Sequence, residues 1–169
     1  TGLVAHVALG HPVCGRLGDA VEAACKEVGI DAVRGGTYLA MEGPQFSTLA
    51  ESNLYRSWGC DVIGMTNMPE AKLAREAEIC YATVAMVTDF DCWHPDHDHV
   101  TVEAIIKMLL ENAEKGRTLV KQVAPKLSGR TDTCAHGCHT ALEHALITAP
   151  EARDPDMIQK LSAVAGRVL

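Results

Sequence analysis

Two carboxylates that stand one residue apart, Asp89 and Asp91, are the side chains of this sequence best suited to proton transfer. They follow residues 81–88, an apolar and β-branched segment that is typical of a buried strand. If the extended conformation continues, alternate side chains point the same way and both carboxylates enter one pocket. Two like charges so close cannot both ionise at low cost, so one carboxyl group is expected to keep a proton and act as a general acid. The alternative is a solvated acidic turn at the end of a strand.

A short link between a strand and a helix offers a place for an anion. In residues 64–70 a strand is expected to end and a helix to begin within a few residues. The Thr66 hydroxyl and the following helix N-terminus would favour a phosphate or a ribose hydroxyl, and the alternative is a plain β–α turn. The sequence contains neither G-x-G-x-x-G nor G-x-x-x-x-G-K-[ST], so it lacks a glycine-rich mononucleotide loop.

The segment 42–46 (Glu-Gly-Pro-Gln-Phe) combines a rigid corner with an aromatic side chain. Its Phe46 ring would stack on a flat heterocycle, or else pack in the hydrophobic core.

Two further segments contain residue types that bind metals. Residues 94–99 alternate histidine with acidic residues, as in a metal-binding tract or a solvated lid. Cys134 and Cys138 lie in a Cys-Ala-His-Gly-Cys-His run that has the residue types of a zinc site, but their spacing is wide and no second pair follows. A structural metal, a local disulfide and free thiols stay open there, and we expect no metal at the functional site. The other cysteines are expected to be reduced and to pack as small hydrophobes.

Hydrophobic periodicity predicts alternating strands and helices. Strands are expected at residues 3–9, 31–40, 61–65 and 81–88, and helices at 16–28, 47–58, 69–77 and 100–123. This order predicts an α/β fold with a central mixed, largely parallel sheet flanked by helices. Ligands of such sheets bind beyond the carboxyl ends of the strands, which points to residues 66–68 and 88–94.

The last part of the chain differs in character. Residues 125–139 are predicted to form a loop, followed by short helices at 140–147 and 154–168. We therefore expect a main domain at residues 1–124 and a C-terminal segment at 125–169 that packs on it or on a neighbouring subunit.

Composition excludes two classes of partner. The 169 residues carry a formal net charge of -7 and no cluster of lysine and arginine, which argues against nucleic acid and anionic membrane surfaces. No apolar run is long enough to cross a bilayer and no signal peptide is apparent, so a cytoplasmic location is expected. The chain begins inside a predicted strand, which we interpret as a fragment of a longer protein.

Several blocks, in order and with near-gapless spacing, resemble the methylthioadenosine phosphorylase branch of the purine nucleoside phosphorylases. The blocks are Met41–Ser47, Ala50–Ser52, Trp58–Ile63, Met65–Thr66, Pro69–Glu70 and Ala85–Trp93. The resemblance runs from about His6 to Val123. It implies a nucleoside phosphorylase-like fold and a trimer with an active site near each subunit boundary.

The resemblance also implies roles for individual residues. Asp89 would protonate the purine N7, and Asp91 would help to hold the amino group of the ring. By the same resemblance, Phe46 would stack on the purine face, Thr88 would contact the base, Met65 would contact the ribose and Thr66 would contact the phosphate. Val102, Ile105 and Ile106 would contact the methylthio group. His6 would contact the methylthio group in the neighbouring subunit's site.

The implied reaction is the phosphorolysis of 5'-methylthioadenosine to adenine and 5-methylthioribose 1-phosphate, in purine and methionine salvage. It needs no cofactor, since inorganic phosphate is a co-substrate. The related 6-oxopurine phosphorylases carry Asn where Asp89 stands, so adenine is expected to be preferred to hypoxanthine. Further phosphate-binding residues of the family belong to an N-terminal half that this sequence lacks, and Val13 replaces a Phe of many relatives. The alternatives are a 6-oxopurine or methylthioinosine phosphorylase and a non-catalytic purine-binding module.

Overall fold

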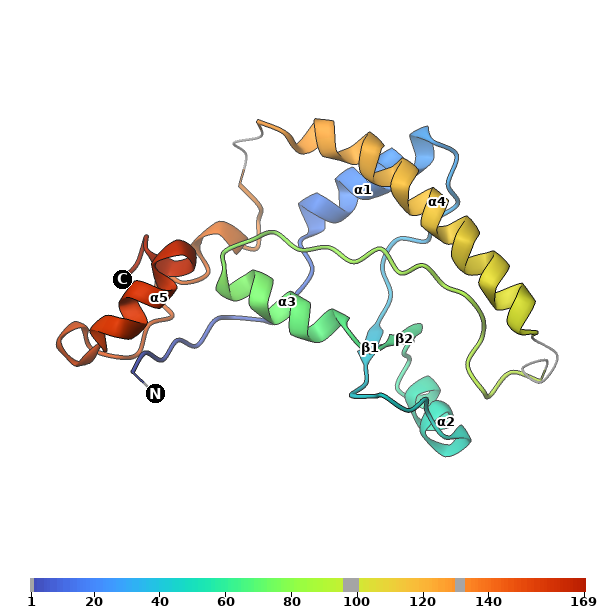
Figure 1. Cartoon of the computed structure of the whole chain (residues 1–169), viewed down its shortest axis with the longest axis horizontal. Helices are drawn as coiled ribbons and strands as arrows, with labels where there is room; N and C mark the ends of the chain where they lie inside the picture. The colour runs from blue at the N-terminus through green and yellow to red at the C-terminus, as the bar shows by residue number, and fades with distance from the viewer. Residues whose placement is uncertain (1, 96–100, 130–132) are drawn as a thin grey trace. The chain divides into compact units, whose positions relative to one another are not determined.

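The computed structural model describes residues 2–95, 101–129 and 133–169, and it confirms the predicted α/β class. In chain order the elements are α1 (Gly15–Glu27), β1 (Tyr38–Ala40), α2 (Leu49–Ser57), β2 (Val62–Gly64), α3 (Asn67–Glu76), α4 (Val102–Leu127), the 3-10 helices η2 (Cys138–Thr140) and η3 (Pro150–Ala152), and α5 (Pro155–Ala165) (Figure 1). None of the described helices is long and apolar enough to cross a bilayer.

The chain divides into two compact units, which we describe separately. Unit 1 contains residues 1–19, 68–83 and 131–169, and unit 2 contains residues 20–67 and 84–130. Within unit 1, the tail after residue 132 contacts the two earlier segments. The division into residues 1–124 and 125–169 stays a prediction.

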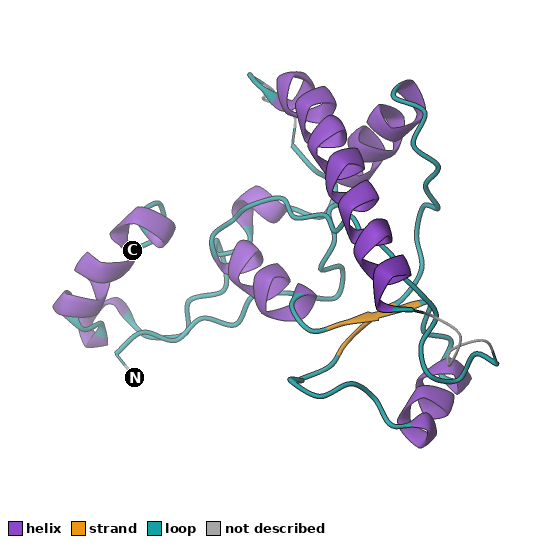
Figure 2. Ribbon diagram, turned by 45° about the vertical axis from the view of Figure 1, so that its right-hand side comes forward, coloured by secondary structure: helices purple, strands orange, loops and turns teal. Residues whose placement is uncertain are grey.

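Unit 2 contains the short parallel sheet, drawn in orange in Figure 2. Tyr38 of β1 pairs with Val62 of β2, and Ala40 pairs with Gly64. The carboxylate of Asp61, just before β2, accepts a 2.6 Å hydrogen bond from the Thr37 N–H, just before β1. Because parallel strands run the same way, the loops that follow β1 and β2 leave the same edge of the sheet.

The core of unit 2 lies between α1 and α4, which lie side by side in both views (Figures 1 and 2). Its buried members are Ala24 and Cys25 of α1 and Leu119 of α4. At the rim, the Glu27 carboxylate accepts hydrogen bonds from Gln122 and Lys126, so polar contacts of α4 extend the apolar ones. Gly29 stops α1 as predicted, since its φ of 70° is a conformation that glycine adopts at little cost.

Helix α2 begins two residues later than expected. The sequence suggested Ser47 as the first residue, whereas Thr48 is the N-cap and Leu49 begins the helix. The Thr48 side chain accepts from the Glu51 N–H, and the Glu51 carboxylate accepts from the Thr48 N–H at 2.8 Å. A capping box requires a separation of three residues, which Thr48 and Glu51 satisfy.

Two predicted strands are wrong. Residues 81–88 are not a strand, and no described strand pairs with them. Residues 3–9 form only one antiparallel bridge, from Ala5 to Leu146. The apolar, β-branched pattern favours an extended backbone, but a strand exists only where a second backbone supplies hydrogen bonds. The Val84, Met86 and Val87 side chains are correspondingly exposed.

Two helix boundaries near prolines differ from the prediction. Helix α3 begins at Asn67, two residues before Pro69, where the helix was expected to start. Helix α4 continues through Pro125 to Leu127, because proline has a helical φ and only the last turn loses a hydrogen bond. Residues 140–147 form turns after η2 rather than a helix. Helix α5 begins at Pro155, within the predicted range 154–168, and the Asp154 side chain caps it.

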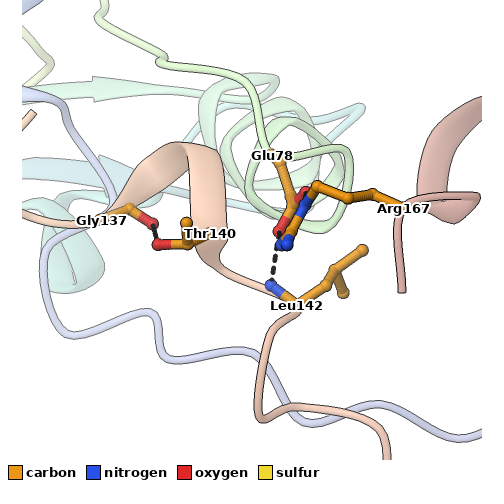
Figure 3. Close-up of polar contacts among 5 residues, drawn as sticks. All are labelled: Glu78, Gly137, Thr140, Leu142 and Arg167. Atoms are coloured by element: carbon orange, nitrogen blue, oxygen red, sulfur yellow. Dashed lines mark hydrogen bonds and ion pairs between the residues drawn. The ribbon is translucent and has the colours of Figure 1, made fainter. Parts of the chain in front are cut away.

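Glu78 joins two of the three segments of unit 1, residues 68–83 and 131–169 (Figure 3). Its carboxylate accepts from the Leu142 N–H at 2.9 Å and from Arg167 at 2.7 and 3.0 Å. The hydrogen bonds from Arg167 are the main cause that lowers the pKa of Glu78, against its partial burial. Its φ of 56° is left-handed, which is uncommon for a residue with a side chain. These contacts offset the cost of that conformation.

Glu78→Gln is expected to lower the Tm by a few degrees at pH 7 and to have little effect near pH 3. A carboxyl group whose pKa is lowered by folding stabilises the protein above its unfolded pKa of about 4.3, and this contribution is lost as the pH falls. Thermal unfolding of both proteins between pH 3 and pH 8 measures the difference. Exposed Glu76 gives the matched control, because Glu76→Gln removes the same charge from the same segment. Equal losses at all pH values would contradict the role of the ionised Glu78.

Candidate active site

Two loops at the carboxyl edge of the sheet form the first part of the candidate site. Residues 41–48 follow β1, and Met65 and Thr66 follow β2 before α3 begins. The Met41 N–H donates to the Gly64 carbonyl at 2.9 Å, so the two loops start side by side. The β–α turn predicted at residues 64–70 is therefore confirmed.

Glycine is required where the two loops touch. A Cβ on Gly43, whose φ is 68°, would lie 2.6 Å from the Met65 Sδ. A Cβ on Gly64 would overlap the hydroxyl of Tyr38. Both positions therefore exclude larger residues, and the Gly-Pro corner seen in the sequence packs directly against Met65.

A third loop reaches the same part of unit 2 and brings Asp91. The Ser52 hydroxyl of α2 donates to the Asp91 carboxylate at 2.6 Å, and the Cys92 N–H donates to it at 2.8 Å. The Cys92 thiol lies 3.6 Å from the Ser47 carbonyl and donates to it. Asp91 is thus oriented by two donors, next to the loop that follows β1.

Asp89 has a different environment from Asp91. It is exposed, and its carboxylate accepts a 2.6 Å hydrogen bond from the Thr88 hydroxyl. The backbone bends at Asp89, so the alternation of an extended strand ends there. The expected pairing of the two carboxylates in one pocket is therefore not seen. The Asp89 side chain lies at the surface and is bonded to the adjacent Thr88, whereas Asp91 is bonded to Ser52 of α2.

Of the other residues expected to contact substrate, Phe46 is the most accessible. Its side chain is 85% exposed, which rules out the alternative that it belongs to the core. Thr66 is also exposed, whereas Met65 is half-buried. An exposed aromatic face and an exposed hydroxyl, on adjacent loops, are groups that can meet a heterocycle and an anion.

An aromatic cluster surrounds the end of the third loop. Phe90 and His94 stack with ring centroids 4.3 Å apart, and the Arg56 guanidinium lies 3.7 Å above the Trp93 ring. His94, which the sequence suggested as a metal ligand, is thus a stacking partner of Phe90. The remaining residues of that tract, Asp96, His97, Asp98 and His99, lie outside the described residues.

The apolar residues expected to meet a methylthio group occupy the first turns of α4. Thr101 caps this helix by accepting from the Ala104 N–H at 3.2 Å. Val102 and Ile106 are exposed and Ile105 is half-buried, at the i, i+3 and i+4 spacing of one helix face. All the candidate residues except one therefore lie in unit 2.

His6 is the exception, since it lies in unit 1. Its backbone N–H donates to the Ala145 carbonyl at 2.8 Å and its side chain is exposed.

Sequence reasoning assigned no role to Ser52, although its side chain is only 1% exposed. A buried serine on the first turn of a helix is common, so its type alone gave no signal. Its position four residues after the capping Thr48, on the side that faces the third loop, is what brings it to Asp91.

Known proteins resemble this chain along most of its length. Residues 3–125 match the family described as the phosphorylase superfamily. The chain is 67% identical over 168 residues to the S-methyl-5'-thioadenosine phosphorylase of Rhodospirillum rubrum, covering 99% of this chain and 57% of that protein. It is 62% identical over 169 residues to the enzyme of the same name in Cereibacter sphaeroides, covering 100% of this chain and 58% of that protein. The chain thus spans a little more than half the length of these curated relatives.

The chain also resembles solved structures over most of its own length. A methylthioadenosine phosphorylase from an antarctic soil metagenomic library superposes with a TM-score of 0.87 at 43% identity, over 96% of this chain and 57% of that one. A double mutant of adenosine/methylthioadenosine phosphorylase from Schistosoma mansoni, in complex with adenine, gives a TM-score of 0.72 at 28% identity, over 83% of this chain and 55% of that one.

Proposed function

The chain belongs to the phosphorylase superfamily, and from this premise we propose that it carries the purine- and methylthio-binding residues of an enzyme that splits 5'-methylthioadenosine with phosphate. The observation that carries the proposal is the 67% identity to an S-methyl-5'-thioadenosine phosphorylase over 99% of the chain. The three loops of unit 2 support it, because they gather an aromatic face, two carboxylates and a hydroxyl near one edge of the sheet.

In the proposed reaction the bond between the purine N9 and the ribose C1' breaks, and a phosphate oxygen forms a new bond to C1'. The sugar gains positive charge while the leaving purine gains negative charge. Asp89, protonated when the substrate is bound, gives its proton to N7, so that the base leaves as neutral adenine. Asp91, held by Ser52, accepts a hydrogen bond from the 6-amino group.

The specificity for a methylthio group rests on α4. The side chains of Val102, Ile105 and Ile106 offer apolar contact to a thioether but leave a 5'-hydroxyl without a hydrogen-bond partner. One missing hydrogen bond costs about 1–3 kcal/mol, which is enough to favour the thioether. Phe46 stacks on the purine, Met65 lies against the ribose and Thr88 lines the base.

Phosphate, the second substrate, is bound only in part by this chain. Thr66 is its one proposed ligand here, and the other ligands come from the N-terminal half of the enzyme. We propose a trimer in which His6 reaches the methylthio group bound by a neighbouring subunit. The enzyme needs no cofactor. Its seven free cysteines suit a reducing cytoplasm.

The proposal is tested by assaying the full-length enzyme and the 169-residue chain with 5'-methylthioadenosine, with and without phosphate. We expect phosphate-dependent release of adenine from the full-length enzyme and none from the chain alone. Faster turnover of inosine or methylthioinosine would indicate a 6-oxopurine enzyme instead. Binding of adenine without any phosphorolysis by the full-length protein would indicate a purine-binding module.

Ser52→Ala is expected to lower kcat/KM for 5'-methylthioadenosine about tenfold with little change in Tm. The variant removes the hydroxyl that orients the Asp91 carboxylate, and one hydrogen bond to a charged group is worth about 1.5–3 kcal/mol. Steady-state kinetics measure the loss. Ser57→Ala is the matched control on the same helix, because the Ser57 hydroxyl donates to the Leu54 carbonyl instead. Equal kinetics for both variants would contradict the positioning role of Ser52.

A further inference from the structure

Four cysteines gather in unit 1, and none of them takes part in the proposed reaction. They are Cys14, Cys80, Cys134 and Cys138, here called the cysteine cluster, and their sulfur atoms all lie within 4.8 Å of one another. Cys14, Cys134 and Cys138 are buried, with Cys14 0% exposed, and Cys80 is half-buried. All four are free thiols. The three segments that form unit 1 each contribute at least one of them.

The number, type and separation of these side chains fit one small metal ion. Four cysteine sulfurs around a tetrahedral Zn²⁺ lie about 2.3 Å from the ion, and so about 3.8 Å from one another. The observed separations exceed this value by an ångström or less, which side-chain rotation can close. We propose that the cysteine cluster binds a single Zn²⁺ ion as a structural tetrathiolate site.

The turn that carries two of the ligands is built as metal-binding turns are. The Cys138 N–H donates to the Cys134 sulfur at 3.1 Å, and this donor favours the thiolate form. Gly137, with a left-handed φ of 60°, lets the backbone turn back so that both sulfurs face one point. The Thr140 hydroxyl donates to the Gly137 carbonyl at 3.3 Å and closes the turn (Figure 3).

Charge around the cluster suits a site with a net charge of -2. The Arg16 guanidinium donates to the Cys80 sulfur at 3.6 Å. Arg75, only 5% exposed, donates to the Ala8 and His11 carbonyls and interacts electrostatically with Cys138. Two arginines beside three buried thiols and one half-buried thiol are unnecessary for an apolar core, but they offset the excess negative charge of a zinc tetrathiolate.

Two other uses of the four cysteines, an iron–sulfur cluster and a disulfide, fit the structure less well. A cluster of four iron atoms needs its cysteines farther apart than a single ion does, because the ligands then reach different metal atoms. A disulfide would use two of the four sulfurs and would need them about 2.05 Å apart.

Binding exchanges up to four thiol protons for one Zn²⁺, with no change of oxidation state. The ion would join residues 14, 80, 134 and 138, so it would stabilise unit 1 by closing two long loops of chain. The sequence shows no second pair of ligands near Cys134 and Cys138, because the other two proposed ligands come from distant segments.

The test is the metal content of the full chain, purified with reductant and without chelator or a metal-affinity tag. Mass spectrometry of the dissolved metals is expected to find about one zinc per chain. Cys14→Ser and Cys80→Ser should each lose nearly all of it. Cys25→Ser, at an equally buried cysteine outside the cluster, and Cys60→Ser should keep it.

A second measurement does not depend on the variants folding. Zinc is removed from the wild-type chain by chelation at low pH, and Co²⁺ or Zn²⁺ is returned to the reduced protein. Co²⁺ should give the intense visible bands and the sulfur-to-metal absorption of a tetrahedral thiolate site, and Zn²⁺ should raise the Tm. The proposal is overturned by protein that contains no zinc and whose Tm does not respond to it, by iron in equimolar amount, or by a disulfide within the cluster.

Discussion

Asp89→Asn in the full-length enzyme is expected to lower kcat/KM for 5'-methylthioadenosine by about 10²–10⁴-fold, the usual contribution of a general acid. An amide cannot give a proton to N7, so the leaving adenine keeps its negative charge. Because Asp89 is exposed and its one hydrogen bond comes from the adjacent Thr88, the variant should fold normally.

The same variant should shift the preference among bases. Asparagine can donate to a 6-oxo group, so the ratio of inosine to adenosine turnover is expected to rise. Steady-state kinetics on both nucleosides measure it, and Asp31→Asn, at another exposed aspartate, is the control. Unchanged rates on 5'-methylthioadenosine would remove Asp89 from the mechanism, and an unchanged ratio would remove it from base selection.

Leu119→Ala is expected to destabilise unit 2 by about 2–5 kcal/mol, the range for a large-to-small change in a core. Leu119 is 4% exposed and packs against Ala24 and Cys25 of α1, which are too small to fill the space that it would leave. Urea unfolding measures the free energy of unfolding.

The control is the next residue of the same helix. Val120 is 62% exposed, and Val120→Ala removes methyl groups from the other side of α4. It should change the free energy of unfolding by less than about 0.5 kcal/mol. Equal losses at the two positions would contradict the assignment of the core to the face that carries Leu119.

The helices were predictable from sequence and the strands only in part. The apolar periodicity of α1 and α4 is local, so it fixes their positions within one or two residues at most ends. A strand depends on a partner strand that sequence does not specify, which is why β1 and β2 form while residues 81–88 do not form a strand. The end of α4 was predicted before Pro125, but the helix continues past it because a proline in the last turn costs little free energy.

In the candidate site too, features set by neighbouring residues were predictable from the sequence, whereas features set by distant residues were not. The turn that holds Met65 and Thr66 was visible because a strand and a helix meet there. The separation of Asp89 from Asp91 was not, since it depends on a bend and on a hydrogen bond from Ser52, which is 39 residues away. The cysteine cluster was hidden for a similar reason, because Cys14 and Cys80 come close only in three dimensions.

Unit 1 is assembled from pieces that a ribosome releases at widely separated times. Residues 1–19 emerge before residue 20, but their partners in residues 131–169 follow only after the whole of 20–130 has been made. At about 5–20 residues per second, that delay is on the order of 10 s. During it the α1–α4 core of unit 2 can already form, while Glu78 still lacks its partners Leu142 and Arg167. A nascent chain halted before residue 131 should therefore be cut by protease within residues 1–19 and 68–83.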